Sequence, residues 1–429
     1  MSADRDRMAA KVRSTVEAVW RIESGRIVAA LARMLRDVGV AEELAQDALV
    51  SAIEQWTGDG IPDNPGAWLM ATAKHRAIDL LRRRALHDRE EDALTREIEE
   101  QLGSSFEDPA KGAEDPIGDD LLRLIFTACH PVLTPEARAA LTLRMVGGLA
   151  TPEIARAFLV PEPTIAQRIV RAKRTLADAQ VPFELPGPAE LAERLESVLE
   201  VVYLIFNEGY SATSGPDWTR PTLCEEALRL GRMLAELAPG ESEVHGLVAL
   251  MEIQASRLRA RVAPDGTPIL LADQNRNLWD QLLIRRGLAA LKRAEALGGA
   301  RGVYALQGAI AACHARAPSL EATDWKRVAS LYDALAALLP SPVIELNRAV
   351  AVGRAFGPQH GLGIVEALAA HPAMKSYHLL DSVRGDLLEK LGRLDEARAA
   401  FERAAELTQN AREKELLRAR AQARPPSNT

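Results

Sequence analysis

The chain has 429 residues, of which 47% are hydrophobic and only 4% aromatic, and its formal net charge is −7. This length predicts two or three domains, and the near absence of runs of β-branched and aromatic residues argues against a β-rich fold, so we expect an all-α protein. Cys129, Cys224 and Cys313 lie far apart without a CxxC pair, which is typical of a reducing cytoplasm and indicates no metal site.

The sequence shows no apolar run of about 18 residues and no signal peptide, so we expect a soluble, cytoplasmic protein without a membrane span. The neighbouring Cys129 and His130 lack further ligands nearby, and we interpret them as structural residues. No cofactor is predicted.

A first helical module is expected over residues 1–88, with helices near 27–37, 40–56 and 65–84. The second of these helices has apolar positions at Leu44, Ala48, Ile53 and Trp56 and an acidic face of Glu42, Glu43 and Asp47. The tail of the third is basic, since Asp79 is its one acid beside Lys74, Arg76, Arg82, Arg83 and Arg84.

Residues 89–120 have a different composition. Twelve acidic residues lie between Glu90 and Asp120, against Arg96 and Lys111 alone, and glycines and prolines interrupt any helix. This pattern predicts a flexible acidic linker. Two interpretations stay open: a solvated spacer, or a mimic of nucleic acid inside a basic channel of a partner.

Residues 121–183 contain the most informative pattern of the chain. A supporting helix is expected from Thr134 to Val146, before Gly147 and Gly148. A second one starts at Thr151, a suitable N-cap followed by Pro152, and presents Ile154, Ala155 and Phe158 on one face. The segment 160–163, Val-Pro-Glu-Pro, then breaks the chain.

A third helix is expected from about Pro163 to Leu176, with a buried stripe of Ile165, Ile169, Ala172 and Leu176. Its other side is polar and basic, so the pair of helices is typical of a DNA-binding helix-turn-helix. We predict base contacts for Thr164, Gln167 and Arg168, and phosphate contacts for Arg171, Lys173 and Arg174. The alternative is an amphipathic helix with solvated charges.

The remaining residues, 184–429, predict a long helical region with short breaks. Residues 391–401 resemble part of a tetratricopeptide repeat, in which small residues at Ala397 and Ala404 beside Phe401 allow two helices to pack closely. Pro340 and Pro372 end earlier units and lie 32 positions apart, close to the period of about 34 residues in tetratricopeptide repeats. Such an array usually exposes a concave surface that binds protein or peptide.

In this order, the motifs resemble the sigma-70 family of the extracytoplasmic-function (ECF) type. Residues 41–56 look like the region 2 helix that docks on the clamp of the RNA polymerase β′ subunit. Trp68 and residues 73–84 look like the segment that melts and recognises the minus-ten element. Residues 125–177 look like region 4, which recognises the minus-thirty-five element. The resemblance implies a transcription initiation factor whose partners are promoter DNA and core RNA polymerase, through its β′ clamp and β flap.

The same resemblance implies the site residues outside the helix-turn-helix. For the minus-ten element these are Trp68, Lys74, His75, Arg76, Asp79, Arg82 and Arg83. For polymerase binding they are Glu43, Leu44, Gln46, Asp47 and Leu49.

Residues 203–210, 272–280, 309–315 and 340–351 look like the tetratricopeptide-type extension of one ECF subgroup, which implies a regulatory or supporting role. Two docking places stay open for this extension: the first helical module of the same chain, or the polymerase. Two positions depart from the family pattern: Leu159 replaces the glycine that is usual in the turn, and His75 stands where many relatives have asparagine.

Two rival functions fit parts of the sequence. A stand-alone helix-turn-helix regulator with a sensing domain would bind DNA tightly by itself, which the acidic net charge disfavours. An enzyme in the C-terminal half is disfavoured because no phosphate-binding loop, HExxH or nucleophile motif is present. The polar clusters at 207–210 and 273–276 are better explained as helix ends or an interdomain contact.

Overall fold

The computed structural model describes residues 2–88, 116–158, 160–187, 190–212 and 217–422. Over these ranges the chain is helical without a strand, and an isolated bridge joins Val262 and Pro268. The prediction of an all-α fold is therefore confirmed. The chain forms two compact units, Met1–Val201 and Val202–Thr429.

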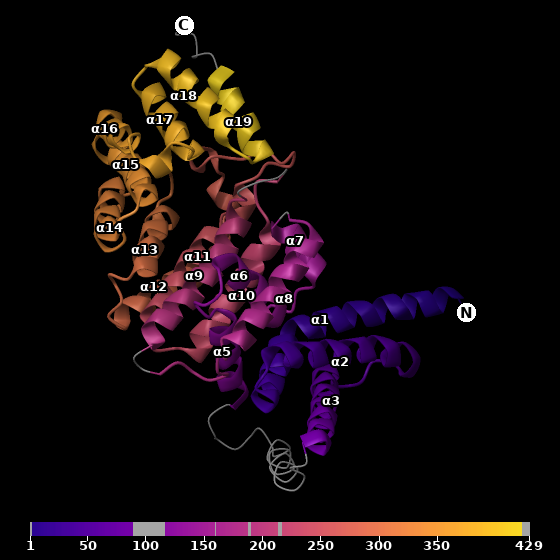
Figure 1. The fold of residues 1–429 in the computed structure, drawn as a ribbon. Coiled ribbons are helices and arrows are strands. Elements are labelled where there is room, and N and C mark those ends of the chain that lie inside the picture. The colour runs from indigo at the N-terminus through magenta and orange to yellow at the C-terminus, as the bar shows by residue number, and fades with distance from the viewer. Residues whose placement is uncertain (1, 89–115, 159, 188–189, 213–216, 423–429) are drawn as a thin grey trace. The chain divides into compact units, whose positions relative to one another are not determined.

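Three helices open unit 1: α1 (Ser2–Leu35), α2 (Val38–Asp59) and α3 (Pro65–Asp88). They pack on one another, as the indigo ribbons of Figure 1 show. The start of α2 is fixed by the Asp37 side chain, which accepts hydrogen bonds from the backbone N–H groups of Gly39 at 2.8 Å and Val40 at 3.0 Å. All three predicted helices are present: α1 begins earlier than predicted and ends at Leu35 rather than at Asp37, and α2 and α3 are longer than predicted.

Four further helices complete the central part of unit 1: α5 (Pro116–Ala128), α6 (Pro135–Met145), α7 (Thr151–Phe158) and α8 (Glu162–Asp178). Helix α7 begins one residue earlier than predicted. Ala150 occupies the N-cap position of α7. The Ala150 carbonyl accepts a hydrogen bond from the Ile154 N–H, and the Ala150 N–H donates one to Glu153 Oε2 at 2.7 Å. The predicted N-cap Thr151 is thus the first helical residue.

The predicted linker differs from the structure at its end. Residues 89–115 lie outside the described residues, as does the turn position Leu159, but 116–120 form the first turns of α5 rather than linker. Asp120 is buried there and forms ion pairs with Arg33 at 3.2 Å and Arg123 at 2.7 Å. Its partners explain why an acidic residue ends up inside the fold.

Helix α9 (Leu191–Tyr210) contains the boundary between the two units. Its first half belongs to unit 1, where Arg194 Nη2 donates to the Phe126 carbonyl at 2.8 Å and Ser197 Oγ donates to the Cys129 carbonyl at 2.6 Å. Unit 1 consequently extends beyond residue 183, the end of the helix-turn-helix domain in the sequence-based division.

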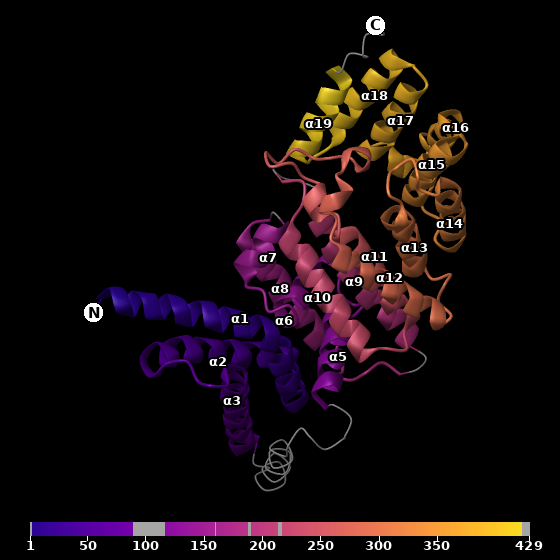
Figure 2. The ribbon, with the colours of Figure 1, turned by 180° about the vertical axis from the view of Figure 1, so that it is seen from behind.

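Unit 2 consists of helices that pack largely on their neighbours in the chain (Figures 1 and 2). After α9 they are α10 (Pro221–Leu237), α11 (Ser242–Ala255), α12 (Gln281–Ala296), α13 (Val303–Arg316), α14 (Trp325–Leu338), α15 (Pro342–Phe356), α16 (Pro358–Leu368), α17 (His378–Lys390), α18 (Leu394–Leu407) and α19 (Ala411–Gln422). Short 3₁₀ turns η2 (Leu258–Ala260), η3 (Leu271–Asp273) and η4 (Arg276–Leu278) lie between α11 and α12, and η5 (Pro372–Met374) precedes α17.

The close packing predicted for residues 391–404 is present between α17 and α18. Ala397, Phe401 and Ala404 are buried at 3%, 1% and 0% exposure. A Cβ atom built at Gly385 of α17 would lie 2.6 Å from the Phe401 ring, so only glycine allows this approach.

Gly385→Ala should therefore destabilise unit 2. The added methyl group overpacks the Phe401 ring, and we expect a loss of about 1–3 kcal/mol, measured as a lower midpoint of urea unfolding. Gly363→Ala in α16 is the matched control, since nothing lies within 4 Å of its Cβ position and alanine favours a helix by about 1 kcal/mol over glycine. Equal midpoints for both variants would contradict this packing.

Candidate nucleic-acid interface

Helix α8 buries the predicted stripe. Ile165, Ile169, Ala172 and Leu176 are its buried residues, and the helix packs on α6 and α7. The opposite side is therefore presented outward: Thr164, Gln167, Arg171 and Arg174 are exposed, and Arg168 is half-buried. Arg174 forms a local ion pair with Asp178 at 3.4 Å. This arrangement of polar side chains can meet base edges and phosphates in a groove.

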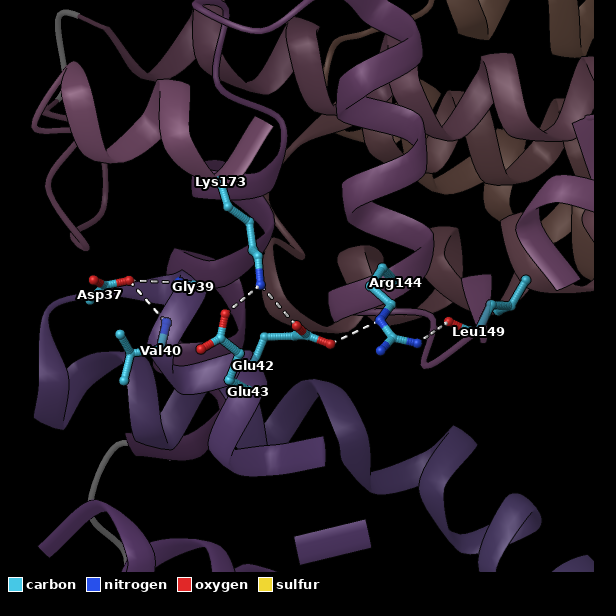
Figure 3. Close-up of polar contacts among 8 residues, drawn as sticks. All are labelled: Asp37, Gly39, Val40, Glu42, Glu43, Arg144, Leu149 and Lys173. Atoms are coloured by element: carbon cyan, nitrogen blue, oxygen red, sulfur yellow. Dashed lines mark hydrogen bonds and ion pairs between the residues drawn. The ribbon is translucent and has the colours of Figure 1, made fainter. Parts of the chain in front are cut away.

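Lys173 lies differently from the other predicted DNA contacts. Its Nζ is 3.2 Å from Glu42 Oε2 and 3.3 Å from Glu43 Oε1, both on α2, and its side chain is only 15% exposed (Figure 3). In the structure, the ammonium group is paired with these two carboxylates.

Glu42 is the centre of this contact. Its carboxylate also accepts a hydrogen bond from Arg144 Nε of α6 at 2.8 Å, and the side chain is 7% exposed (Figure 3). Arg144 Nη1 donates in turn to the Leu149 carbonyl at 3.3 Å. We call Glu42, Glu43, Arg144 and Lys173 the Glu42 cluster.

The predicted acidic face of Glu42, Glu43 and Asp47 is not uniform, because Glu42 is buried whereas Glu43 and Asp47 are exposed. A buried carboxylate needs a partner for its charge, and two cations from the helix-turn-helix module supply it here. Since these partners lie 102 and 131 positions away in the chain, the local sequence pattern contained no sign of them.

Further contacts join the first helices to the helix-turn-helix module. Arg21 of α1 pairs with Glu153 of α7 at 2.8 Å, and Arg33 of α1 pairs with Asp120 of α5 at 3.2 Å. Lys74 of α3 lies near this second pair: burial lowers its pKa, the Arg33 charge lowers it further, and Asp120 opposes the change. Neither of these two ion pairs was predicted from the sequence.

The other residues predicted to contact the minus-ten element lie along α3. His75, Asp79, Arg82 and Arg83 are exposed. Arg76 instead donates to Ser51 Oγ at 2.6 Å and lies 3.7 Å from Asp47 Oδ2, so it ties α3 to α2. Trp68 is half-buried and packs edge-on against Trp56, with ring centroids 5.4 Å apart.

Of the predicted polymerase contacts on α2, Glu43 and Asp47 are exposed, whereas Leu44, Gln46 and Leu49 are half-buried. Val50, which the sequence interpretation did not include, is 52% exposed. It follows Glu43 and Asp47 at helical spacing, so the three share one face. An apolar residue next to an acidic face was the signal that could have identified it.

Cys129 and Cys224 are buried, whereas Cys313 and His130 are half-buried. Burial raises the pKa of the Cys129 thiol to about 11 and that of Cys224 to about 12, so neither is a ready thiolate. His130 Nδ1 accepts from the Val132 N–H at 3.1 Å. Among the residues that the structure describes, no three histidine, cysteine or acidic side chains form a cluster that could hold a metal.

Known protein families match several parts of this chain. Residues 21–86 match sigma-70 region 2, and residues 123–176 match sigma-70 region 4. Residues 194–295 match a family of unknown function, DUF6596.

An uncharacterized protein of Rhizobium meliloti (strain 1021) is 44% identical over 395 residues, 91% of each chain. The ECF RNA polymerase sigma factor SigC of Mycobacterium tuberculosis is 29% identical over 177 residues, which are 41% of this chain and 84% of that protein. Another relative in that species, a probable ECF RNA polymerase sigma factor SigI, is 26% identical over 166 residues, 39% of this chain and 56% of that protein.

The two region matches define a sigma-70 factor, with the region 2 and region 4 domains that α1–α3 and α5–α8 form. The similarity to ECF sigma factors assigns the type: this chain belongs to the ECF group of the sigma-70 family and carries an additional C-terminal helical domain. None of its described helices combines the length and the apolar character that a membrane span requires.

Glu42→Gln should loosen the contact between the two sigma domains. Losing the buried carboxylate leaves Arg144 and Lys173 without their shared counter-charge, so the docked form loses about 2 kcal/mol. Spin labels at Val50→Cys on α2 and Ala177→Cys on α8, in a Cys313→Ala background, would report a broader and longer distance distribution.

Glu43→Gln is the control, because its side chain is 70% exposed and such surface ion pairs contribute only about 0–1 kcal/mol. If Glu42→Gln left the distance distribution as narrow as in the parent, the Glu42 cluster would not hold the domains together.

Proposed function

We propose that this sigma factor directs core RNA polymerase to promoters and that the structure corresponds to its closed, polymerase-free form. Region 2 and region 4 together supply this function in the sigma-70 family. In the proposal, the α2 face around Glu43 and Asp47 binds the β′ clamp. Helix α3 recognises the minus-ten element, and α8 recognises the minus-thirty-five element through Thr164, Gln167 and Arg168. Region 4 also contacts the β flap.

The observation that carries the closed form is the Glu42 cluster. It joins the helix proposed to bind polymerase to the helix proposed to bind DNA, with Lys173 Nζ 3.2 Å from the Glu42 carboxylate. The two promoter elements are separated by about 25 base pairs, or roughly 85 Å of B-form DNA at a rise of about 3.4 Å per pair. Helices held in direct contact cannot serve both elements at once, so promoter binding requires the domains to separate.

The charges of the cluster support such a separation. Glu43 takes part both in the cluster and in the proposed polymerase surface, and Lys173 in both the cluster and the proposed phosphate contacts. When polymerase and DNA supply new partners, each charge exchanges one partner for another. The free protein, with a net charge of −7, is expected to bind DNA weakly until this exchange takes place.

The remaining parts of the proposal follow from the family. The chain acts by recognition rather than as an enzyme, in the cytoplasm, and its C-terminal extension regulates or supports transcription, in part by contacting the sigma domains. The rival function, a stand-alone DNA-binding regulator, would instead require tight binding to DNA without polymerase.

Transcription with purified core polymerase tests the recognition helix. We expect a specific start site on the DNA upstream of the gene only when both components are present. Arg168→Ala should lose most of this transcript, because a good base contact gives about 1–3 kcal/mol of discrimination. Tight, polymerase-independent DNA binding together with no transcript would favour the rival function.

Arg144→Gln tests the closed form, since this residue belongs to the cluster but to neither proposed recognition surface. Weakening the closed form by about 1–2 kcal/mol should raise the apparent affinity for core polymerase roughly 5- to 30-fold. Arg26→Gln, at an exposed position on α1, is the control. An affinity that stays the same or falls in Arg144→Gln would show that closure does not compete with polymerase.

A further inference from the structure

A cluster of arginines lies in unit 2, between α11 and α12 and beside α13. The guanidinium carbons of Arg257 and Arg276 lie 5.3 Å and 4.5 Å from the centroid of the Trp279 ring. That of Arg261 lies 3.8 Å from the centroid of the Tyr210 ring. The structure thereby brings together residues of the polar clusters at 207–210 and 273–276, for which the sequence predicted no role beyond helix ends or an interdomain contact.

These three cations have neutral partners. Arg257 Nε donates to Gln274 Oε1 at 3.1 Å, and Arg261 Nη2 donates to the Tyr210 carbonyl at 3.1 Å. Arg276 Nη1 donates to the carbonyls of His314 at 2.6 Å and Ala317 at 2.8 Å. These partners leave three positive charges uncompensated by any ion pair within the described part of unit 2.

The electrostatic surroundings of Arg257 agree with a group of positive charges that have no ion-pair partner. Burial lowers the pKa of its guanidinium group, and the charges of Arg261 and Arg276 act in the same direction. The same two effects, burial and then the charges of Arg257 and Arg276, lower the pKa of His314 to about 4, so its ring is neutral at pH 7. Glu321, an exposed side chain, is the acid whose charge bears on Arg276.

Hydrogen-bond donors are also left over at this place. Buried donors without a partner among the described residues include Arg261 Nε, Arg276 Nη2, Trp279 Nε1 and the Tyr210 hydroxyl. His314 Nδ1, which a neutral ring can use as donor or acceptor, also has no partner there. The Arg261 residue is only 9% exposed. Folded proteins pair most buried polar atoms, so a concentration of unpaired donors around like charges calls for a group that brings acceptors and negative charge.

We propose that this cluster binds a small phosphate-bearing anion. A phosphate group carries up to two negative charges and several acceptor oxygens, which suits guanidinium and indole N–H donors that can accept nothing in return. The aromatic rings are covered by guanidinium groups, so the recognised part of the ligand is its phosphate rather than a stacked base. The proposal concerns unit 2 and does not depend on the closed form of the sigma domains.

Thermal unfolding of the full chain tests the site, with inorganic phosphate and pyrophosphate as probes at constant ionic strength. A saturable rise in the unfolding temperature is expected for the parent. Arg257→Gln should weaken the apparent affinity at least tenfold. Arg259→Gln is the matched control, because Arg259 is exposed on the same short turn, η2, and should behave as the parent.

Arg257→Lys, which keeps the charge but not the planar fork of donors, guards against a variant that simply fails to fold and should bind more weakly than the parent. Two competitors identify the ligand class: citrate for carboxylates, and a short single-stranded DNA for nucleic-acid phosphate. The proposal is overturned if neither probe stabilises the parent, if Arg257→Gln responds as the parent does, or if either competitor binds as tightly as pyrophosphate.

Discussion

The buried carboxylate of Glu42 is the constraint on which the arrangement of the sigma domains depends. At 7% exposure it cannot keep its charge without partners, and the partners it has, Arg144 and Lys173, both come from the helix-turn-helix module. The packing of α1 on α5, with the Arg33–Asp120 pair, adds a second contact between the same modules. A charge that needs partners from another domain makes the stability of region 2 depend on the position of region 4.

Because of this dependence, the two domains can adopt more than one arrangement when other charged partners are present. An apolar interface of similar size would hold region 4 whether or not polymerase or DNA were present, because burial of apolar surface is not specific for partner charges. Glu43 and Lys173 can instead be satisfied by other charged surfaces. In the proposed mechanism, the same side chains would suit a closed form in the free protein and an open form on promoter DNA, provided that the exchanged contacts are of similar strength.

Sequence analysis predicted the features that are local in the chain. The stripe of Ile165, Ile169, Ala172 and Leu176 repeats with the helical period, and the same residues are buried in the structure. The start of α6 at Thr134 was likewise identified from a local pattern. The burial of Glu42 and Asp120 was missed, because each depends on cations that only the tertiary fold brings near. Residue contacts with DNA and polymerase stay predictions, since they depend on surfaces outside this chain.

The Glu42 cluster and the arginine cluster around Trp279 differ in how their charges are compensated. This difference indicates a different role for each. In the Glu42 cluster, acids and bases compensate one another, so the contact is complete within the chain and can act as a closure. Around Trp279, arginines meet carbonyls, an amide and aromatic rings, which satisfy part of their hydrogen bonding, and no ion pair among the described residues compensates their charge. Because like charges held together at low exposure oppose folding, such a cluster is best explained by an anion that the chain itself does not supply.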